Sequence, residues 1–325
     1  IPVAQAGSLI STQQEIEIGR DVGRQLEKEY GLVEDPELQA RVDRIGKSMV
    51  AVCDRRDLPY SFKVLNSKEV NALAAPGGFI YVFKGLVDLM PSDDELAGVI
   101  GHELGHVVKR HAVRQMEKSL GMTLLFGLIL GDKAVFLQNL AMNAIMAGYS
   151  REDERQADQL GFIHSYKAGY NPYSMMIGLQ KLSELDSNSH YDLFSDHPES
   201  QARISLVQGY MNSAGIKPHV AMTDGGKAAQ IYEGEWKMPP LYGTYDGYKP
   251  IYRADFAAGI LYRLSQLPDY SADKFIVDTD GTNCTIYYGD QSVLVVTPED
   301  ASANGMSVMD LTGVYVQKLK EWQAK

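Results

Sequence analysis

The sequence predicts an α+β fold in which a mainly helical domain with a small β-sheet precedes a small C-terminal α+β module. Apolar residues recur at helical spacing through most of the first 210 residues. Two short runs rich in β-branched and aromatic residues interrupt this pattern between 61 and 83, and a series of strand patterns follows residue 270. With 45% hydrophobic and 22% charged residues, the chain has the composition of a globular protein.

The first elements mix helix and strand. Apolar residues at helical spacing predict two helices between 11 and 53. The runs 61–65 (SFKVL) and 78–83 (GFIYVF) predict strands, because β-branched and aromatic residues are bounded there by turn residues.

A long helix is expected from Ser92 onward. The sequence Ser92-Asp93-Asp94-Glu95 has the form of a capping box, in which the Ser92 side chain accepts from the third amide and Glu95 reaches back. Apolar positions keep helical spacing on both sides of the segment 101–106 (GHELGH), which indicates a buried helix.

The remaining elements follow from the same patterns, with Gly, Pro and Asn as boundaries. Helices are expected at 133–148, 150–168, 172–186, 198–213 and 254–266. Strands are expected at 274–279, 284–288 and 292–297, followed by a last helix from 298 or 307 to 322. The stretch 223–249, rich in Gly, Pro and Tyr, predicts a linker or an irregular arm, so the expected domains are 1–220 and 221–325.

Charge, cysteine content and hydropathy exclude several classes of protein. A formal net charge of −11 argues against a nucleic-acid partner. Cys53 and Cys284 stand far apart, so they indicate neither a thiolate metal site nor a disulfide framework, although one disulfide stays open. The apolar run 120–131 is too short to span a bilayer. Ile1 at the start and the small-x-small triplet 4–6 (AQA) predict an exported protein whose signal segment is absent from this sequence.

The segment His102-Glu103-Leu104-Gly105-His106 predicts a metal centre. On a helix, His102 and His106 project from one face and can ligate one zinc ion. Glu103 lies beside them and can take a proton from the water that the ion acidifies. The alternative is a solvated helix with two unrelated histidines, which the apolar setting of this helix opposes.

A catalytic zinc ion needs a third protein ligand and an open fourth position. Glu154 is the candidate, with Glu152 as a competitor that spacing does not exclude. Asp158 shares a helix face with Glu154 and can accept a hydrogen bond from a ligating histidine. A charged, solvated helix face is the alternative for this stretch.

Together with NALAAPGGFIYV at 71–82 and SREDERQAD at 150–158, the HELGH segment resembles the HtpX-like and CAAX-prenyl-endopeptidase family of zinc metallopeptidases, in particular its soluble exported bacterial members. The likeness covers roughly residues 10–210 and implies a gluzincin core with one Zn²⁺ per chain. It also implies that Glu154 is the third ligand, rather than Glu152, and that Asp158 is the supporting carboxylate.

The resemblance extends to His197-Pro198 and Arg203. It implies that His197 stabilises the developing oxyanion or, as in some exported relatives, latches the open zinc position, and that Arg203 orders the site. It further implies that one segment is an edge strand that pairs with an extended peptide. This substrate-binding segment comprises Gly77, Gly78, Phe79, Ile80 and Tyr81.

The function expected from these observations is zinc-dependent endopeptidase activity on unfolded or misassembled proteins, in quality control of the bacterial envelope. The expected location is the periplasm or a membrane surface. A different interpretation is a chaperone or assembly factor with a latent zinc site. A third makes the C-terminal module a docking piece for a membrane or envelope complex. For the apolar run 120–130, two predictions stay open: a buried core helix or a flexible, membrane-facing lid.

Overall fold

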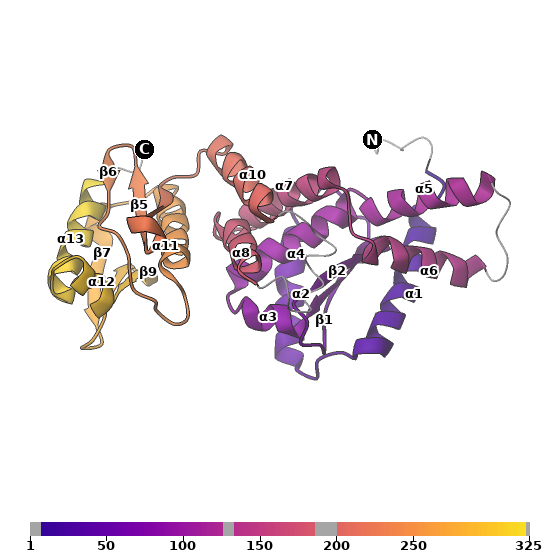
Figure 1. Ribbon diagram of the computed structural model, residues 1–325, viewed down its shortest axis with the longest axis horizontal. Coiled ribbons are helices and arrows are strands. Elements are labelled where there is room, and N and C mark those ends of the chain that lie inside the picture. The colour runs from indigo at the N-terminus through magenta and orange to yellow at the C-terminus, as the bar shows by residue number, and fades with distance from the viewer. Residues whose placement is uncertain (1–7, 126–132, 186–199, 323–325) are drawn as a thin grey trace. The chain divides into compact units, whose positions relative to one another are not determined.

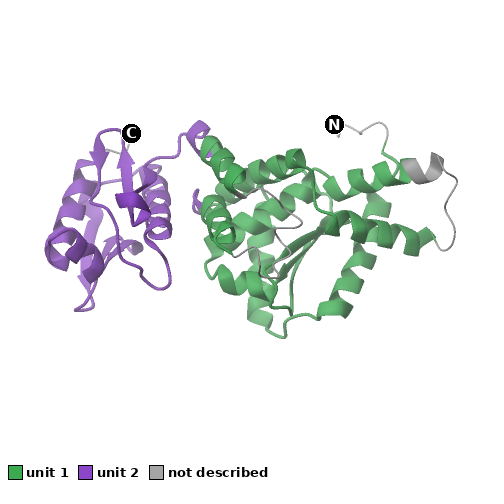
Figure 2. Cartoon of the chain, viewed as in Figure 1, with its two compact units in different colours: residues 1–170, 174–210 green, residues 171–173, 211–325 purple. Residues whose placement is uncertain are grey.

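The structure is a computed structural model that describes residues 8–125, 133–185 and 200–322. The chain divides into two compact units, residues 1–170 with 174–210, and residues 171–173 with 211–325 (Figure 2). The described residues form a mainly helical α+β fold, as predicted. The expected domain boundary near residue 220 stays a prediction.

The first unit contains most of the helices. They are α1 (Thr12–Tyr30), α2 (Pro36–Val50), α3 (Lys84–Leu89), α4 (Asp93–Val108), α5 (His111–Leu125), α6 (Lys133–Met146), α7 (Arg151–Lys167), α8 (Ser174–Ser183) and α10 (Ser200–Ser213), of which the last turn passes into the second unit. Its strands are β1 (Ser61–Leu65), β2 (Ala72–Ala75) and β3 (Phe79–Phe83), and a 3₁₀ turn, Pro76–Gly78, joins the last two.

The sheet of the first unit lies between two layers of helices (Figure 1). Successive side chains of a strand point to opposite faces, so each strand contributes to both sides. Ile80 and Val82 of β3 pack with residues of α2 and α4, whereas Tyr81 and Phe83 pack with residues of α1, α5 and α6. Burial on both faces explains why β2 and β3 are continuously apolar.

The expectation that the segment Gly77–Tyr81 provides an edge strand is wrong. The strand order is β1-β3-β2, so β3 is the central strand, parallel to β1 and antiparallel to β2. Its main-chain groups therefore pair with strands of the same sheet. Gly77 and Gly78 instead form the turn between β2 and β3, with φ angles of 77° and 97° that favour glycine.

Helices α4 and α7 approach each other closely through small residues. A Cβ atom added to Gly105 would lie 2.9 Å from the backbone of Ala157, and one added to Gly161 would lie 2.9 Å from the amide nitrogen of His102. The close approach brings the helix that carries His102 and His106 against the helix that carries Glu154. These glycines are therefore part of the framework of the site.

Gly105→Ala is expected to lower the free energy of unfolding by about 1–3 kcal/mol, because the added methyl group forces the two helices apart. Gly121→Ala in α5 is the control, since no described atom lies within 4 Å of the position a Cβ would take there. This control should be neutral or slightly stabilising, because Ala favours a helix over Gly. Urea unfolding of both variants, followed by circular dichroism, measures the difference, and equal stability of the two would contradict the packing argument.

The second unit has two three-stranded sheets, β4-β5-β6 and β7-β8-β9. Their strands are β4 (His219–Thr223), β5 (Ala228–Glu233), β6 (Trp236–Lys237), β7 (Phe275–Thr279), β8 (Cys284–Tyr288) and β9 (Gln291–Val296). The helices are α11 (Pro250–Ser265), α12 (Pro298–Ala303) and α13 (Val308–Glu321). A buried ion pair, with 2.6 Å between Nη2 of Arg253 and Oδ2 of Asp300, joins α11 to α12.

Two expectations about this region need correction. The stretch 223–249 is not an irregular linker throughout, because β5 and β6 lie within it. The last predicted helix is two helices, α12 and α13, separated at Asn304–Ser307.

Cys53 and Cys284 are both buried and free. Within the described residues, no helix combines the length and the apolarity that crossing a bilayer requires.

Candidate metal centre

Helix α4 positions the residues of the HELGH segment. The predicted capping box is confirmed, because Ser92 accepts from the amide of Glu95 and the Glu95 carboxylate accepts from the amide of Ser92. From Glu95 to Val107 every residue of the helix is buried. His102, Glu103 and His106 are at most 4% exposed, so their polar groups need partners inside the protein.

The structure brings three of the predicted ligands together. The Nε2 atoms of His102 and His106 lie 3.0 Å apart, and each lies 3.5 Å from a carboxylate oxygen of Glu154 on α7. The Glu154 side chain is 2% exposed. In the part of the chain that the structure describes, this is the cluster of three His, Cys, Asp or Glu side chains suited to hold a metal ion.

Asp158 fixes the orientation of the His102 ring. Its Oδ1 atom lies 2.9 Å from Nδ1 of His102, and because a carboxylate only accepts, Nδ1 carries the hydrogen. Burial, followed by the positive charge of Arg203, lowers the pKa of His102, so the ring is neutral. The lone pair of its Nε2 atom is therefore directed toward His106 and Glu154.

Arg203 on α10 joins the two carboxylates. Its guanidinium donates to both oxygens of Asp158, at 2.8 and 2.7 Å, and its Nη1 atom lies 3.3 Å from Glu154. Burial alone would raise the pKa of Asp158, but the charge and hydrogen bonds of Arg203 hold it well below its usual value. The buried carboxylate is thus ionised, and the predicted ordering role of Arg203 is consistent with these contacts.

The three ligand atoms suit a small divalent cation. Zinc holds nitrogen and oxygen ligands at about 2.0–2.2 Å in a tetrahedron, which places ligand atoms about 3.3–3.6 Å from one another. The observed separations of 3.0–3.5 Å are close to this range. Two nitrogen ligands and one carboxylate also form a donor set typical of a catalytic site, which leaves a fourth position open.

Position in the helix separates Glu154 from its competitor. Glu152 is 67% exposed and lies 3.8 Å from Arg155 at the surface, whereas Glu154 is buried against the two histidines. The alternative of a solvated helix face thus holds for Glu152 and not for Glu154. His197 lies outside the described residues, so both of its expected roles stay predictions.

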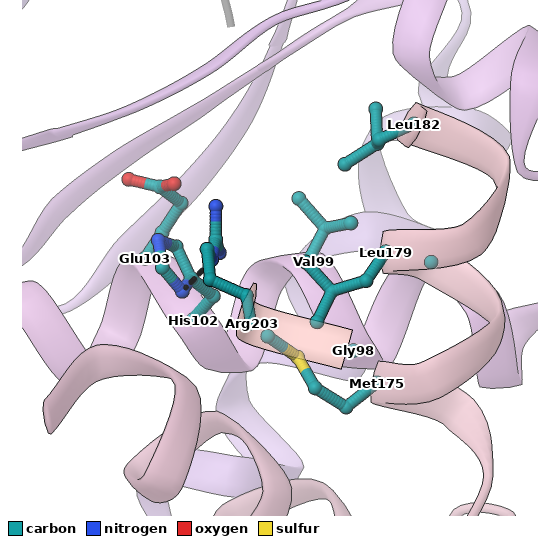
Figure 3. Close-up of a pocket in the computed structure, with 9 residues that line it drawn as sticks. Gly98, Val99, His102, Glu103, Met175, Leu179, Leu182 and Arg203 are labelled. Atoms are coloured by element: carbon teal, nitrogen blue, oxygen red, sulfur yellow. Dashed lines mark hydrogen bonds between the residues drawn. The ribbon is translucent and has the colours of Figure 1, made fainter. Parts of the chain in front are cut away.

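A small pocket opens beside the histidine helix. Figure 3 shows His102, Glu103 and Arg203 along one side, and Val99, Met175, Leu179 and Leu182 along the other. The polar side thus belongs to the metal centre, and the apolar side is formed by α4 and α8. Glu103 lines this pocket without belonging to the ligand cluster.

The sequence did not predict two aromatic rings that lie beside His106, those of Tyr149 and His111. The Tyr149 ring stacks on the His106 ring at a centroid distance of 4.0 Å, and His111 lies with its Nδ1 atom 2.8 Å from Nδ1 of His106. Burial lowers the pKa of His111 to about 4. On an uninterrupted helix His111 would point away from His106, so only knowledge of the helix break after Val108 could have revealed it.

Comparisons with known proteins agree with this geometry. A model of peptidase family M48 matches residues 36–211, which is more than half of the chain, and a model of a domain of unknown function (DUF8459) matches residues 237–324. Metalloprotease LoiP of Escherichia coli (strain K12) is 32% identical over 166 residues, or 49% of this chain and 66% of the relative. The beta-barrel assembly-enhancing protease of the same strain is 27% identical over 233 residues, or 67% and 47%.

A third relative is the mitochondrial metalloendopeptidase OMA1 of Arabidopsis thaliana, which is 30% identical over 184 residues, or 55% of this chain and 37% of the relative. The chain thus spans between 37% and 66% of the length of these three relatives. The resemblance found in the sequence is confirmed at the level of the family, although the HtpX-like subtype is not distinguished. The family match covers the strands of the first unit, α4 and α7, and therefore every described ligand, so the chain belongs to peptidase family M48.

Proposed function

We propose that this chain is a zinc-dependent endopeptidase. The observation that carries the proposal is the buried triangle of His102, His106 and Glu154, whose ligand atoms lie 3.0–3.5 Å apart. The family is one of peptidases, which supports hydrolysis of peptide bonds as the reaction. Zinc is the metal that best suits two imidazoles and one carboxylate around an open position.

Each residue of the centre has a distinct proposed role. His102, His106 and Glu154 hold the ion, which when bound supplies a Lewis acid for the peptide carbonyl and acidifies the attacking water. Glu103 takes the proton of that water and returns it to the leaving amine. Asp158 keeps the His102 ring in the tautomer that directs Nε2 at the metal, and Arg203 keeps Asp158 ionised and in place.

The substrates we propose are unfolded or misassembled proteins of a bacterial envelope, with the chain in the periplasm or at a membrane surface. The name of the beta-barrel assembly-enhancing relatives supports this assignment. The apolar side of the pocket beside Glu103 suits an apolar side chain of the substrate next to the bond that is cleaved.

We place the extended peptide along β2 rather than β3. β2 is an outer strand of the sheet and packs against α4, the helix that carries His102 and His106. Residues Ala72–Ala75 are buried, with at most 4% exposure, so a peptide can pair there only after a neighbouring segment opens.

Removal of the metal tests this proposal. The zinc-loaded chain is expected to cleave unfolded casein, to lose this activity when a chelator removes the ion, and to regain it when stoichiometric zinc is restored. Gel electrophoresis of casein fragments and metal analysis of the same samples give the two readouts. Suppression of casein aggregation with no cleavage at any zinc content would contradict the proposal and favour the chaperone interpretation.

A further inference from the structure

A third histidine, His111, lies directly behind the proposed zinc ligand His106. The Nδ1 atoms of His106 and His111 are 2.8 Å apart, within hydrogen-bond distance, and both rings are at most 2% exposed. On its other side, Nε2 of His111 lies 3.3 Å from Oε1 of Gln156 and 3.4 Å from Oδ1 of Asp153. His111 therefore links α4 to α7 behind the metal centre.

The chain reaches this arrangement through a sharp turn between α4 and α5. α4 ends at Val108, Arg110 has a φ angle of 57°, and α5 begins at His111. A residue other than glycine seldom adopts this left-handed backbone conformation without compensating contacts. The guanidinium of Arg110 donates to the Glu15 carboxylate at 3.0 Å and to the carbonyl oxygen of Ile10 at 2.7 Å, so the turn is anchored to α1 and to the segment that precedes α1.

The direction of the hydrogen bonds of His111 follows from the residues that contact its Nε2 atom, Gln156 and Asp153. The Glu152 carboxylate only accepts, so the Gln156 amide turns its NH₂ group toward it, at 2.9 Å, and presents its oxygen to His111. Asp153 also offers only an acceptor. Nε2 of His111 therefore carries the hydrogen. At most one hydrogen fits between two Nδ1 atoms 2.8 Å apart, so the Nδ1 atom of His111 accepts through its lone pair when that of His106 donates.

We infer that His111 is a positioning residue for the metal: it accepts a hydrogen bond from Nδ1 of His106, fixes the tautomer of that ring and so directs the His106 Nε2 lone pair at the ion. This inference rests on the proposed function. With His102 oriented by Asp158 in the same way, two lone pairs and the Glu154 carboxylate then face one another. Such a set of acceptors suits a bound cation.

A simpler role for His111 is that of a packing partner for aromatic rings. The Tyr149 ring stacks on the His106 ring, and the centroid of the His111 ring lies 5.8 Å from that of Tyr149. Two substitutions separate the roles. His111→Asn retains an acceptor at nearly the position of Nδ1, whereas His111→Leu fills a similar volume without an acceptor. Lys109→Ala, at an exposed position of the same turn, is the matched control.

The readout is zinc affinity, measured by competition with a chromogenic chelator. Loss of an outer hydrogen-bond partner of a ligating histidine weakens metal binding by about 10- to 100-fold, which is the effect expected for His111→Leu. His111→Asn should stay within a few-fold of the wild type, and Lys109→Ala should not differ from it. Equal weakening by Asn and Leu, or an unchanged affinity in the Leu variant, would overturn the inference. A wild type that binds no zinc would instead refute the proposed function.

The wild type offers a second test that does not depend on the folding of any variant. Long-range ¹H–¹⁵N correlation spectra of the zinc-loaded chain, labelled in its seven histidines, report which ring nitrogens carry hydrogen. The expected pattern is a hydrogen on Nδ1 of His106 and on Nε2 of His111. A hydrogen on Nδ1 of His111 would reverse the bond and disprove the positioning role.

Discussion

Glu103→Gln is expected to reduce the cleavage of unfolded casein by about 10²- to 10⁴-fold, the usual contribution of a general base, while the zinc content of the chain stays that of the wild type. Glu103 lines the pocket beside His102 and Arg203 but stands outside the cluster of ligand atoms. A Gln side chain has the same shape and no basic oxygen, so it removes proton transfer and preserves the surroundings.

Two controls make this result interpretable. Glu17→Gln, at an exposed position of α1, makes the same chemical change away from the site and should leave the cleavage rate unaltered. Metal analysis of the Glu103→Gln chain excludes loss of zinc as the cause. Cleavage within tenfold of the wild-type rate, with zinc retained, would show that another group serves as the base.

The sequence was sufficient for the histidine helix and for the placement of its two imidazoles, because local rules determine both. A capping box at Ser92 sets where α4 begins, and the spacing of His102 and His106 on that helix brings their ring nitrogens to one point. Spacing left Glu152 and Glu154 open as ligands. The resemblance favoured Glu154, and the structure separates the two by burial.

The strand order could not be predicted from the sequence, because strand pairing depends on distant parts of the chain. β2 consists of Ala72-Leu73-Ala74-Ala75, whose alanines carry little strand preference, so it was not recognised. The family resemblance made the segment 77–81 an edge strand, and with β2 unrecognised the sequence offered no second neighbour for it. A run that is apolar on both faces is more typical of a central strand, and that is its place in the structure.

The contact of His111 was hidden for a different reason. Helical periodicity assigns directions to side chains only while the helix continues, and here it stops between Val108 and His111. The break requires the positive φ angle of Arg110, which is supported by its bonds to Glu15 and Ile10. Neither distant partner can be identified from the residues of the turn itself.

Glu154→Ala is expected to have the second large effect, the loss of bound zinc. A protein-bound structural zinc ion is held by about 10–16 kcal/mol shared among four ligands, so one ligand contributes roughly 10²- to 10³-fold in affinity. The carboxylate oxygens of Glu154, on α7, lie 3.5 Å from the Nε2 atoms of both histidines on α4. Among the described residues, no other carboxylate belongs to this cluster and could replace it. The chain should still fold, because the Asp158–Arg203 pair remains.

Zinc content per chain, measured on the wild type beside Glu154→Ala, His106→Ala and Glu152→Ala, tests the central claim most directly. We predict stoichiometric zinc in the wild type and in Glu152→Ala, and far less than that in the other two variants after dialysis. Stoichiometric zinc in Glu154→Ala, or its loss from Glu152→Ala alone, would contradict the assignment of the metal centre.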